Sequence, residues 1–241
     1  MFSLIVPAYN EGNNIFHNLE VMENTLLEIL PDGDFEIIPV NDGSKDNTAE
    51  EIRRAADSLQ KINPVIYEIN RGKGGALIEG VSHTKGDIVA FLDADLDISP
   101  NHFKTYIPAY KDNHADVVIG SKMHKDSNLD YPLARKVFSV GYFVLLKILF
   151  GMGLKDTQTG IKLYRGDLIR EIAPKLTVKG FAFDIEILAL ALARKAKIIE
   201  MPVEIVYSRE SATSRIKFKD IWKMFTDTLG IWWRIRIKKN Y

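Results

Sequence analysis

The sequence predicts an α/β fold in which helices cover both faces of a mostly parallel central sheet. Short apolar runs of strand length alternate with longer segments whose apolar residues repeat on one helical face. The apolar runs are continuous rather than alternating, as in strands that are buried on both faces. Segments rich in Gly, Asn and Asp separate them and supply the turns. These three observations are typical of repeated strand–helix units around a parallel sheet.

The first half of the chain contains these units in strict order. We expect strands at residues 4–6, 35–40, 65–69, 87–92 and 116–120, and helices at residues 15–29, 48–59, 75–82 and 102–111. The first helix is predicted by Ile15, Leu19 and Met22, which fall on one helical face. Because Pro39 cannot donate to a sheet ladder, we expect a strand end or a bulge there.

The second half changes in character after about residue 130. We expect an apolar helix at 133–150, a polar loop at 155–160, a strand at 161–164, a helix at 183–194 and a strand at 198–207. Residues 218–237 are predicted to form an amphipathic tail that contains all three Trp of the protein, Trp222, Trp232 and Trp233. No internal repeat or low-complexity linker is visible. We therefore expect one domain at 1–217, with halves at about 1–120 and 121–217, and an appendage at 218–241.

Composition and charge exclude several classes of protein. A hydrophobic fraction of 46% and an aromatic fraction of 10% indicate a globular chain rather than a disordered one. The 32 Lys and Arg residues balance the 32 Asp and Glu residues, whereas nucleic-acid-binding proteins are usually basic. We therefore expect no nucleic-acid partner. The absence of Cys excludes disulfides, a thiol nucleophile and a Cys-ligated metal, and it suits a reducing cytosol.

Two segments bear on whether the chain enters a membrane. Residues 1–7 have no basic region and no small-residue cleavage site, so we expect no secretory signal. The longest apolar stretch, 137–153, is interrupted by Ser139 and Lys147 and falls short of the roughly 20 uncharged residues that a spanning helix needs. We therefore expect a protein that is soluble or lies on a membrane surface.

An acidic cluster follows the apolar strand that ends near residue 92. Asp93, Asp95 and Asp97 occupy alternate positions, which puts them on one side if the chain stays extended. Such closely spaced carboxylates repel one another unless a cation joins them, and hard oxygen ligands select Mg²⁺ or Mn²⁺. In an open parallel sheet, ligands bind beyond the carboxyl ends of the strands, where this cluster falls. The alternative interpretation is an acidic, solvated turn.

Two more strand ends carry carboxylates. Glu11 follows the first strand, and Asp42 and Asp46 follow the second. Turn formation explains the neighbouring Gly, Asn and Ser residues, but not why three strand ends present carboxylates to one edge. A nucleotide site needs such acceptors for base and ribose groups, together with a metal for the diphosphate.

The glycine-rich segment 70–76 resembles a phosphate-binding loop that precedes a helix. Asp93 lies about 20 residues further on, as the ribose-binding acid of a dinucleotide fold does. However, Leu77 takes the place of the last glycine of the dinucleotide motif, and the loop does not follow the first strand. A dehydrogenase is therefore disfavoured.

Four motifs follow one another at residues 6–11, 41–48, 70–76 and 93–95. In this order they resemble the family 2 glycosyltransferases of GT-A fold. More narrowly, they resemble the polyprenyl-phosphate (dolichyl-phosphate) hexosyltransferases, which move a sugar from a nucleotide to a lipid phosphate. The resemblance runs from residue 3 to about residue 217. The narrower resemblance rests on residues 120–122, on Arg135 with Ser139, and on residues 156–164 and 181–187.

For the donor half, about 1–120, the resemblance implies a nucleotide-sugar site. The nucleotide-binding residues would be Pro7, Tyr9, Glu11, Asp42 and Lys73. The metal residues would be Asp93, Asp95 and Asp97, with Asp95 on the cation that bridges the diphosphate and Asp93 on the ribose or the metal's water shell. The chain departs from the family at Asn41, which replaces the first Asp of the usual pair, and at Asp97, where mannosyltransferases often have Gln.

For the acceptor half, about 121–217, the resemblance implies a site for a lipid phosphate. The phosphate oxygen is already anionic near neutral pH, so it needs positioning cations rather than a general base. The acceptor-phosphate candidates are Lys122, Arg135, Ser139, Arg209 and Arg215, and the catalytic candidates are Asp93, Asp95, Arg135 and Ser139. Lys122 replaces a common Arg and loses its bidentate fork. A solvated basic surface is the alternative for these cations.

Two carboxylates of the motif at 181–187 fit a different acceptor. Asp184 and Glu186 would serve as base or metal partner in relatives that use a hydroxyl acceptor. Here we favour a structural or positioning role for Asp184.

The tail at 218–241 predicts a membrane-interface element. Its Trp and other apolar residues are mixed with a basic end, a composition that suits the headgroup layer. Packing of the tail onto the domain or onto a dimer partner is the alternative. A homodimer and a membrane-protein partner both stay open.

These observations predict an inverting, divalent-metal-dependent transferase at the cytosolic face of a membrane. It would move a hexose to a polyprenyl phosphate. Residues 71–75 resemble the dolichyl-phosphate glucosyltransferases more than the mannosyltransferases, which favours a UDP-sugar over GDP-mannose. One alternative is a family 2 enzyme with a glycan or other hydroxyl acceptor. Another is a catalytically silent module that binds a nucleotide sugar or a membrane.

Overall fold

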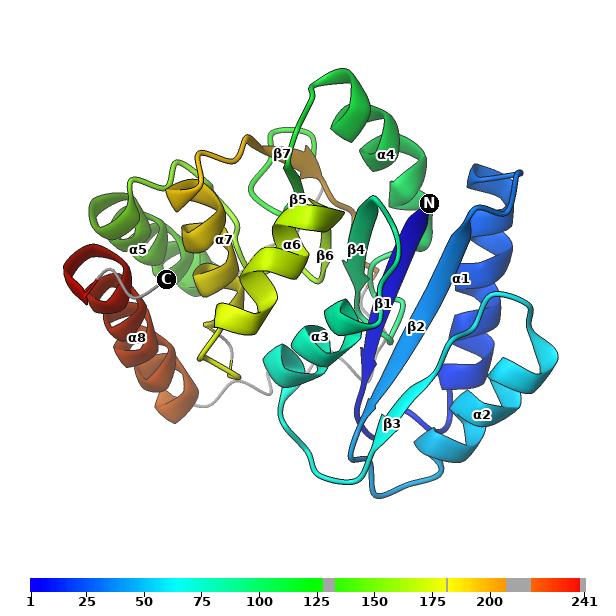
Figure 1. Ribbon diagram of the computed structural model, residues 1–241. Coiled ribbons are helices and arrows are strands. Elements are labelled where there is room, and N and C mark those ends of the chain that lie inside the picture. The colour runs from blue at the N-terminus through cyan, green and yellow to red at the C-terminus, as the bar shows by residue number, and fades with distance from the viewer. Residues whose placement is uncertain (128–132, 181, 207–217, 239–241) are drawn as a thin grey trace.

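A computed structural model describes residues 1–127, 133–180, 182–206 and 218–238, and for 133–140 and 218–221 it describes the backbone alone. Its centre is a seven-stranded sheet with the strand order β3-β2-β1-β4-β6-β5-β7 (Figure 1). The strands are β1 (Phe2–Ala8), β2 (Phe35–Asp42), β3 (Val65–Tyr67), β4 (Ile88–Leu92), β5 (Val117–Ser121), β6 (Ile161–Arg165) and β7 (Ile198–Pro202). Strand β6 runs antiparallel to β4 and β5, and every other pairing in this sheet is parallel.

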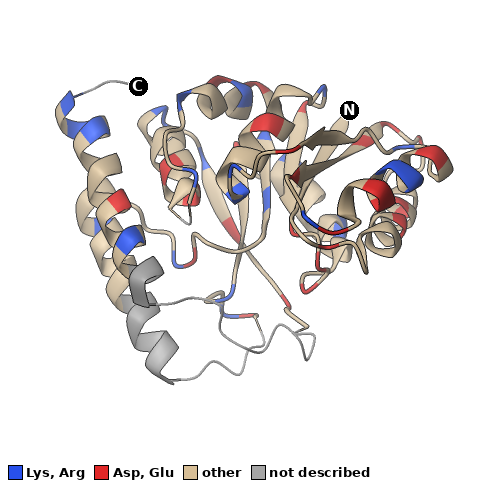
Figure 2. Ribbon diagram, turned by 90° about the horizontal axis from the view of Figure 1, so that it is seen from below, with Lys and Arg blue, Asp and Glu red and all other residues tan. Residues whose placement is uncertain are grey.

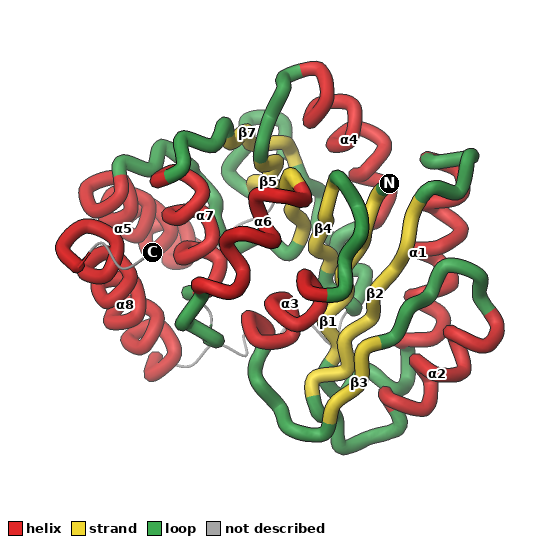
Figure 3. The backbone as a smooth tube through the Cα atoms, viewed as in Figure 1, coloured by secondary structure: helices red, strands yellow, loops and turns green. Residues whose placement is uncertain are grey.

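Helices cover both faces of the sheet, as the sequence predicts (Figure 3). One face carries α1 (Ile15–Ile29), α2 (Thr48–Ser58) and α4 (Phe103–Asp112), and the other carries α3 (Lys73–Ser82), α6 (Gly166–Ile172) and α7 (Phe183–Ala193). Beyond α7 lie α5 (Leu133–Phe150) and α8 (Phe218–Trp233), side by side and joined by a hydrogen bond of 2.7 Å between Tyr142 and Thr228. Short helical turns occupy Pro100–His102, Ala173–Lys175 and Arg234–Lys238.

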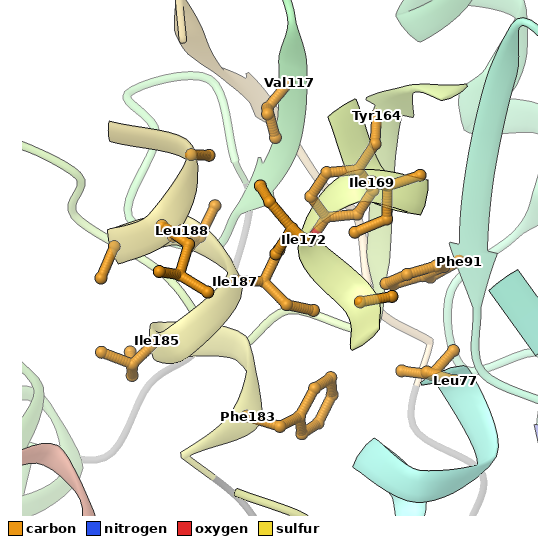
Figure 4. Close-up of a cluster of buried hydrophobic side chains, with 14 of the residues drawn as sticks. Leu77, Phe91, Val117, Tyr164, Ile169, Ile172, Phe183, Ile185, Ile187 and Leu188 are labelled. Carbon is orange, nitrogen blue, oxygen red and sulfur yellow. The ribbon is translucent and has the colours of Figure 1, made fainter. Parts of the chain in front are cut away.

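The core consists of two apolar clusters, one on each face of the sheet. Along β1, Leu4 and Val6 belong to one cluster, and Ile5, which points the other way, belongs to the second. Figure 4 shows part of the second cluster, in which Phe91 and Tyr164 of the sheet face residues of α6 and α7. All three β1 residues are fully buried, which confirms the continuous apolar runs as strands covered on both faces.

The prediction for Pro39 was wrong. Pro39 lies inside β2, opposite Val6, with neither a strand end nor a bulge. Its ring nitrogen faces the β3 side, because Ile37, two residues earlier, exchanges hydrogen bonds with Lys61 and Asn63 on that side. The pairing of β2 with β3 begins only at Val40. Pro39, which has no N–H to donate, is therefore not opposite any residue of β3.

Three other elements differ from the prediction. Strand β7 ends at Pro202 rather than at 207, because the next backbone N–H groups are bound by side chains: Val203 donates to Ser127 and Glu204 to His102. Strand β3 ends at Tyr67, two residues earlier than expected. Helix α6 was not anticipated, since its seven residues are too few to show a clear helical repeat.

In the described part of the chain, no helix is long and apolar enough to cross a membrane. The C-terminal segment is helical, as expected, from Phe218 to Trp233 and onward through the turn Arg234–Lys238. Its residues Thr228 and Ile231 are fully buried against the domain, whereas Trp222 and Trp233 are exposed. The predicted division of the chain at residue 217 stays a prediction.

Candidate functional site

The carboxyl ends of β2, β1 and β4 lie next to one another at one edge of the sheet (Figure 1). These strands are neighbours and run parallel, so the loops after Asp42, Ala8 and Leu92 leave the sheet on the same side. The strand-end residues singled out from the sequence are therefore brought to one edge, as expected.

A small pocket of about 220 Å³ lies at this edge. It is lined by Pro7, Lys73, Leu77, Phe91, Asp93, Thr159, Gly160, Lys162, Phe183 and Asp184. Of the predicted site residues, Pro7, Lys73 and Asp93 share this pocket, although they are far apart in sequence.

Lys73 and Asp93 form an ion pair across the pocket. Lys73 is the first residue of α3, and it follows Gly72, whose positive φ of 77° a residue with a side chain rarely adopts. Burial lowers the pKa of the Lys73 ammonium, but the carboxylates of Asp93 and Asp184 outweigh burial and leave the pKa raised. Lys73 therefore keeps its positive charge beside Asp93.

The other side of Asp93 is closed by Gly160, which begins the approach to β6. The Asp93 N–H donates to the Gly160 carbonyl at 3.2 Å, and a Cβ on Gly160 would lie 2.2 Å from the carboxylate of Asp93. Only glycine fits here, because any side chain would displace the carboxylate.

Asp95 and Asp97 lie in a tight turn beyond Asp93. The Asp97 N–H donates to Asp95 Oδ1 at 3.1 Å, and Leu96 between them has a positive φ of 57°. Desolvation and the neighbouring carboxylates of Asp93 and Asp97 raise the pKa of Asp95. The raised pKa reflects first the burial of Asp95 and then the two neighbouring negative charges.

The crowded carboxylates fit a hard divalent cation, which takes oxygen ligands. Within the described residues, however, no three His, Asp or Glu side chains are close enough to form a metal site by themselves. Asp93 and Asp95 suit a cation that takes its remaining ligands from a bound diphosphate and water, as Mg²⁺ does at phosphate sites.

Lys162 and Asp184 form a buried ion pair in the floor of the pocket. Lys162 comes from β6 and Asp184 from the first turn of α7, and their side chains are 3% and 8% exposed. The Lys162 ammonium donates to Asp184 Oδ1 at 2.7 Å and to the Thr159 carbonyl at 2.6 Å. Burial raises the pKa of Asp184, and the ammonium groups of Lys162 and Lys73 oppose that rise.

Glu186, two residues after Asp184 on α7, is fully buried and makes several hydrogen bonds. It accepts hydrogen bonds from the backbone N–H groups of Thr177 and Val178, at 2.9 and 2.8 Å, and from the Thr177 hydroxyl. Arg234, beyond α8, donates to it at 3.0 Å. Glu186 therefore ties the segment before α7 to the C-terminal helix.

At the end of β2, Asp42 is held by residues that the sequence did not single out. Its Oδ1 accepts hydrogen bonds from the Tyr67 hydroxyl at 2.8 Å and from the Arg71 N–H at 2.7 Å. The Arg71 guanidinium lies over the Tyr67 ring, 4.4 Å from its centre. The buried Asn41, next to Asp42, has a side-chain oxygen with no hydrogen-bond partner among the described residues.

The loops after β1 and β2 are joined by hydrogen bonds. Asp46 accepts from the Gly12 N–H at 3.0 Å and from the Thr48 N–H and hydroxyl, and the Thr48 hydroxyl accepts from the Glu11 N–H at 2.9 Å. Tyr9, in the same loop, is 47% exposed. These contacts fix the loop that carries the predicted nucleoside residues Tyr9 and Glu11.

Of the five acceptor-phosphate candidates, the structure describes the side chain of Lys122 alone. Lys122 follows β5, with its ammonium 3.8 Å from the Asp156 carboxylate. Arg135 and Ser139 lie on α5, where the backbone alone is described, so the structure does not test their side chains. Arg209 and Arg215 lie outside the described residues.

The sequence of the chain decides its family. Residues 3–173 match the sequence model described as glycosyl transferase family 2. The chain belongs to glycosyl transferase family 2. It is 33% identical to a dolichyl-phosphate β-glucosyltransferase of Trichomonas vaginalis, over 95% of this chain and 70% of that protein. A protein of the same name from Dictyostelium discoideum is also 33% identical, over 95% of this chain and 76% of that protein.

Solved structures agree on the fold of this family 2 chain. A mannosyl-3-phosphoglycerate synthase of Rubrobacter xylanophilus matches with a TM-score of 0.71 at 16% identity, over 100% of this chain and 76% of that one. A glucosyl-3-phosphoglycerate synthase of Mycobacterium tuberculosis, crystallised with Mn²⁺, UDP-glucose and phosphoglyceric acid, matches with a TM-score of 0.65 at 17% identity, over 97% and 78%. The expected GT-A fold is confirmed.

Lys162 and Asp156 are two further residues of this site whose roles were not anticipated from the sequence. Lys162 is a charged residue inside a short apolar strand, and a buried charge needs a partner. Asp156 accepts hydrogen bonds from the Lys122 N–H, the Gln158 N–H and the Thr159 hydroxyl, which shapes the loop before β6. The Asp-x-x-Thr spacing of that loop was the available signal for Asp156.

Proposed function

We propose that this family 2 chain transfers a hexose from a nucleotide-diphospho-sugar to a polyprenyl phosphate such as dolichyl phosphate. Glucose is the favoured hexose, because the relatives at about 33% identity are named dolichyl-phosphate β-glucosyltransferases. The form of residues 71–75 favours a UDP-sugar as donor, with GDP-mannose as the alternative.

The buried pair of Lys162 and Asp184 is the observation that carries the choice of a phosphate acceptor. A hydroxyl acceptor must lose a proton to a general base. Asp93 and Asp184 are the two carboxylates that line the pocket of about 220 Å³, here called the donor pocket. Asp184 is the candidate for such a base, because Asp93 would hold the metal. Protonating Asp184 would leave the Lys162 ammonium buried beside a neutral partner. A phosphate acceptor is already anionic and does not require this step.

On the donor side, Asp42 would accept a hydrogen bond from the base, and Tyr67 and Arg71 would hold its carboxylate in place. Lys73 would contact the diphosphate with its charged ammonium. Asp93 and Asp95 would hold Mg²⁺ or Mn²⁺, and Asp97 would add to the charge around it. The bound cation would neutralise the charge that develops on the leaving nucleoside diphosphate.

On the acceptor side, Lys122, Arg135, Ser139, Arg209 and Arg215 are proposed to position the lipid phosphate. Direct attack of a phosphate oxygen on the anomeric carbon, opposite the leaving diphosphate, would invert its configuration. We place the enzyme on the cytosolic face of a membrane, because its acceptor is a lipid and its C-terminal helix exposes Trp222 and Trp233.

An assay with radiolabelled UDP-glucose and a polyprenyl phosphate tests this proposal. The purified protein should form a product that is extracted into organic solvent, that disappears with a chelator and that returns with Mg²⁺ or Mn²⁺. Asp95→Ala should lower turnover at least a hundredfold. A labelled product that stays in water would favour a glycan acceptor, and no product with any donor would favour a silent binding module.

A further inference from the structure

The loop that carries Lys73 lies against the segment that leads into α7. The Gly74 N–H donates to the Lys179 carbonyl at 3.2 Å. A Cβ on Gly74 would lie 2.8 Å from the Cβ of Phe183, the first residue of α7, so the glycine allows this close approach. Lys73 and Phe183 both line the donor pocket. The segment before α7 therefore supports one wall of that pocket.

The same loop also reaches the end of β2. The Arg71 N–H donates to Asp42 Oδ1 at 2.7 Å, and Asp42 is the residue proposed to accept a hydrogen bond from the base. Lys73, two residues further along, is proposed to contact the diphosphate. A shift of this loop would therefore move groups that are assigned to both ends of the nucleotide.

The segment before α7 is itself held by the carboxylate of Glu186. The N–H groups of Thr177 and Val178 donate to Glu186 Oε2 at 2.9 and 2.8 Å, and the Thr177 hydroxyl donates to Oε1 at 2.8 Å. These donors come one and two residues before Lys179, whose carbonyl accepts from the Gly74 N–H. The position of the Glu186 carboxylate therefore fixes the segment that contacts the loop.

Glu186 is in turn paired with the C-terminal helical segment. Arg234, which directly follows α8, donates to Glu186 Oε1 at 3.0 Å, and the two side chains are 30% and 0% exposed. A buried carboxylate is costly to keep in place without a nearby positive charge. Arg234 is held at this position because Thr228 and Ile231 of α8 are fully buried against the domain.

From this chain of contacts we propose that Arg234 is a positioning residue of the donor site, acting through Glu186 and the segment 177–179 on the loop that carries Lys73. Hydrogen bonds and adjoining backbone connect the end of α8 to this loop without interruption, and such contiguous networks carry energetic coupling between distant sites. The docking of the C-terminal helix would thereby set the affinity for the nucleotide sugar. The inference rests on the proposed function and adds a part for this helix in donor binding.

Removing the charge of Arg234 tests the inference. In detergent, Arg234→Gln should raise the KM for the nucleotide sugar at least fivefold, and should leave kcat and the KM for polyprenyl phosphate within twofold. A smaller fraction of folded protein would lower kcat and leave both KM values unchanged, so this result separates positioning from general stability. Arg234→Lys, which keeps the charge, should have a donor KM within twofold of wild type.

The matched control is Arg236→Gln. It removes the same charge two residues later, where the guanidinium contacts the Phe150 carbonyl instead of Glu186, and it should change neither KM. An unchanged donor KM in Arg234→Gln would overturn the inference, as would an equal rise in Arg236→Gln.

Hydrogen exchange measured by NMR keeps the test independent of turnover. In Arg234→Gln, three backbone N–H groups along the chain of contacts should exchange at least tenfold faster than in wild type, namely those of Thr177, Val178 and Gly74. The Leu59 N–H, at the end of α2, should exchange at the wild-type rate. Unchanged exchange at Gly74 contradicts the inference. If the wild type transfers no hexose and binds neither UDP nor GDP, the proposed function fails, and exchange at Gly74 alone then decides whether Arg234 positions the loop.

Discussion

Lys162 and Asp184 form an ion pair that is buried in the fold. Each is nearly excluded from solvent, and their charged atoms lie 2.7 Å apart. Removing one partner of such a pair leaves the other charge buried without compensation, whereas removing both together costs far less.

We predict that Lys162→Met lowers the free energy of unfolding by about 3–5 kcal/mol. Denaturant titration measures this change. Adding Asp184→Leu to the same protein should recover most of the loss. The control is Lys175→Met, which breaks an exposed pair with Glu171 and should cost less than about 1 kcal/mol. Equal losses of unfolding free energy for Lys162→Met and Lys175→Met would contradict the prediction that the buried pair is costlier to break than the exposed one.

Asp46 gives a pH-dependent prediction. Burial raises its pKa, but the hydrogen bonds from Thr48 and Gly12 outweigh burial and leave the pKa below the usual 3.8. A carboxyl whose folded pKa is lowered stabilises the protein above its unfolded pKa, and this contribution is lost as the pH falls through the folded value.

Asp46→Ala should therefore lower stability by about 1 kcal/mol at pH 7, and the difference from wild type should shrink below about pH 4. Thermal or denaturant unfolding across this pH range provides the measurement. The exposed Asp57 on α2 supplies the control, since Asp57→Ala should change stability by less than about 0.5 kcal/mol. A difference that persists unchanged at pH 3 would contradict the assigned hydrogen bonds.

At the scale of elements, α5 and α8 present apolar side chains to solvent. Val144 and Ile148 are 46% and 75% exposed on α5, and Trp222 and Trp233 are 63% and 50% exposed on α8. Lys and Arg residues gather near the end of the helical tail that α8 begins (Figure 2). Apolar, aromatic and basic side chains together suit a membrane surface with anionic lipids.

We predict that the double variant Trp222→Ser, Trp233→Ser binds anionic lipid vesicles at least tenfold more weakly than wild type. Cosedimentation with vesicles measures this binding, which should also weaken as salt is added. The matched control replaces two exposed apolar residues elsewhere, Leu27→Ser and Ile69→Ser, and should bind like wild type. If the Trp variant keeps full binding, α8 is instead a surface for protein contacts.

Elements whose sequence pattern lies within one segment were predicted correctly. Features that depend on distant parts of the chain were not. Helix α1 and strand β4 were predicted because their patterns lie within one segment. Pro39 was misjudged because its tolerance depends on where the partner strand β3 begins to pair. The end of β7 was misjudged for a similar reason, since distant side chains bind the backbone beyond it.

At the scale of the whole molecule, the strand order determines what the site contains. The carboxylates after β1, β2 and β4 were predictable as a group, because parallel neighbours share an edge. The pairs Lys73–Asp93 and Lys162–Asp184 were not, because they depend on α3 and α7 and on the antiparallel insertion of β6 beside β4.

The two carboxylates that line the donor pocket, Asp93 and Asp184, are each paired with a lysine, Lys73 and Lys162. This arrangement suits an acceptor that is anionic before it reacts. Polyprenyl phosphate and the polyprenol of the same chain length differ only in that respect, so they separate the two kinds of acceptor.

The most direct measurement is the rate of hexose transfer from UDP-glucose to these two acceptors, under identical detergent and Mg²⁺ concentrations. We predict transfer to polyprenyl phosphate and at least a thousandfold less to polyprenol, with inversion at the anomeric carbon of the product. Comparable rates on the two acceptors would mean that the protein supplies a base after all, and would contradict the role assigned to Lys162 and Asp184.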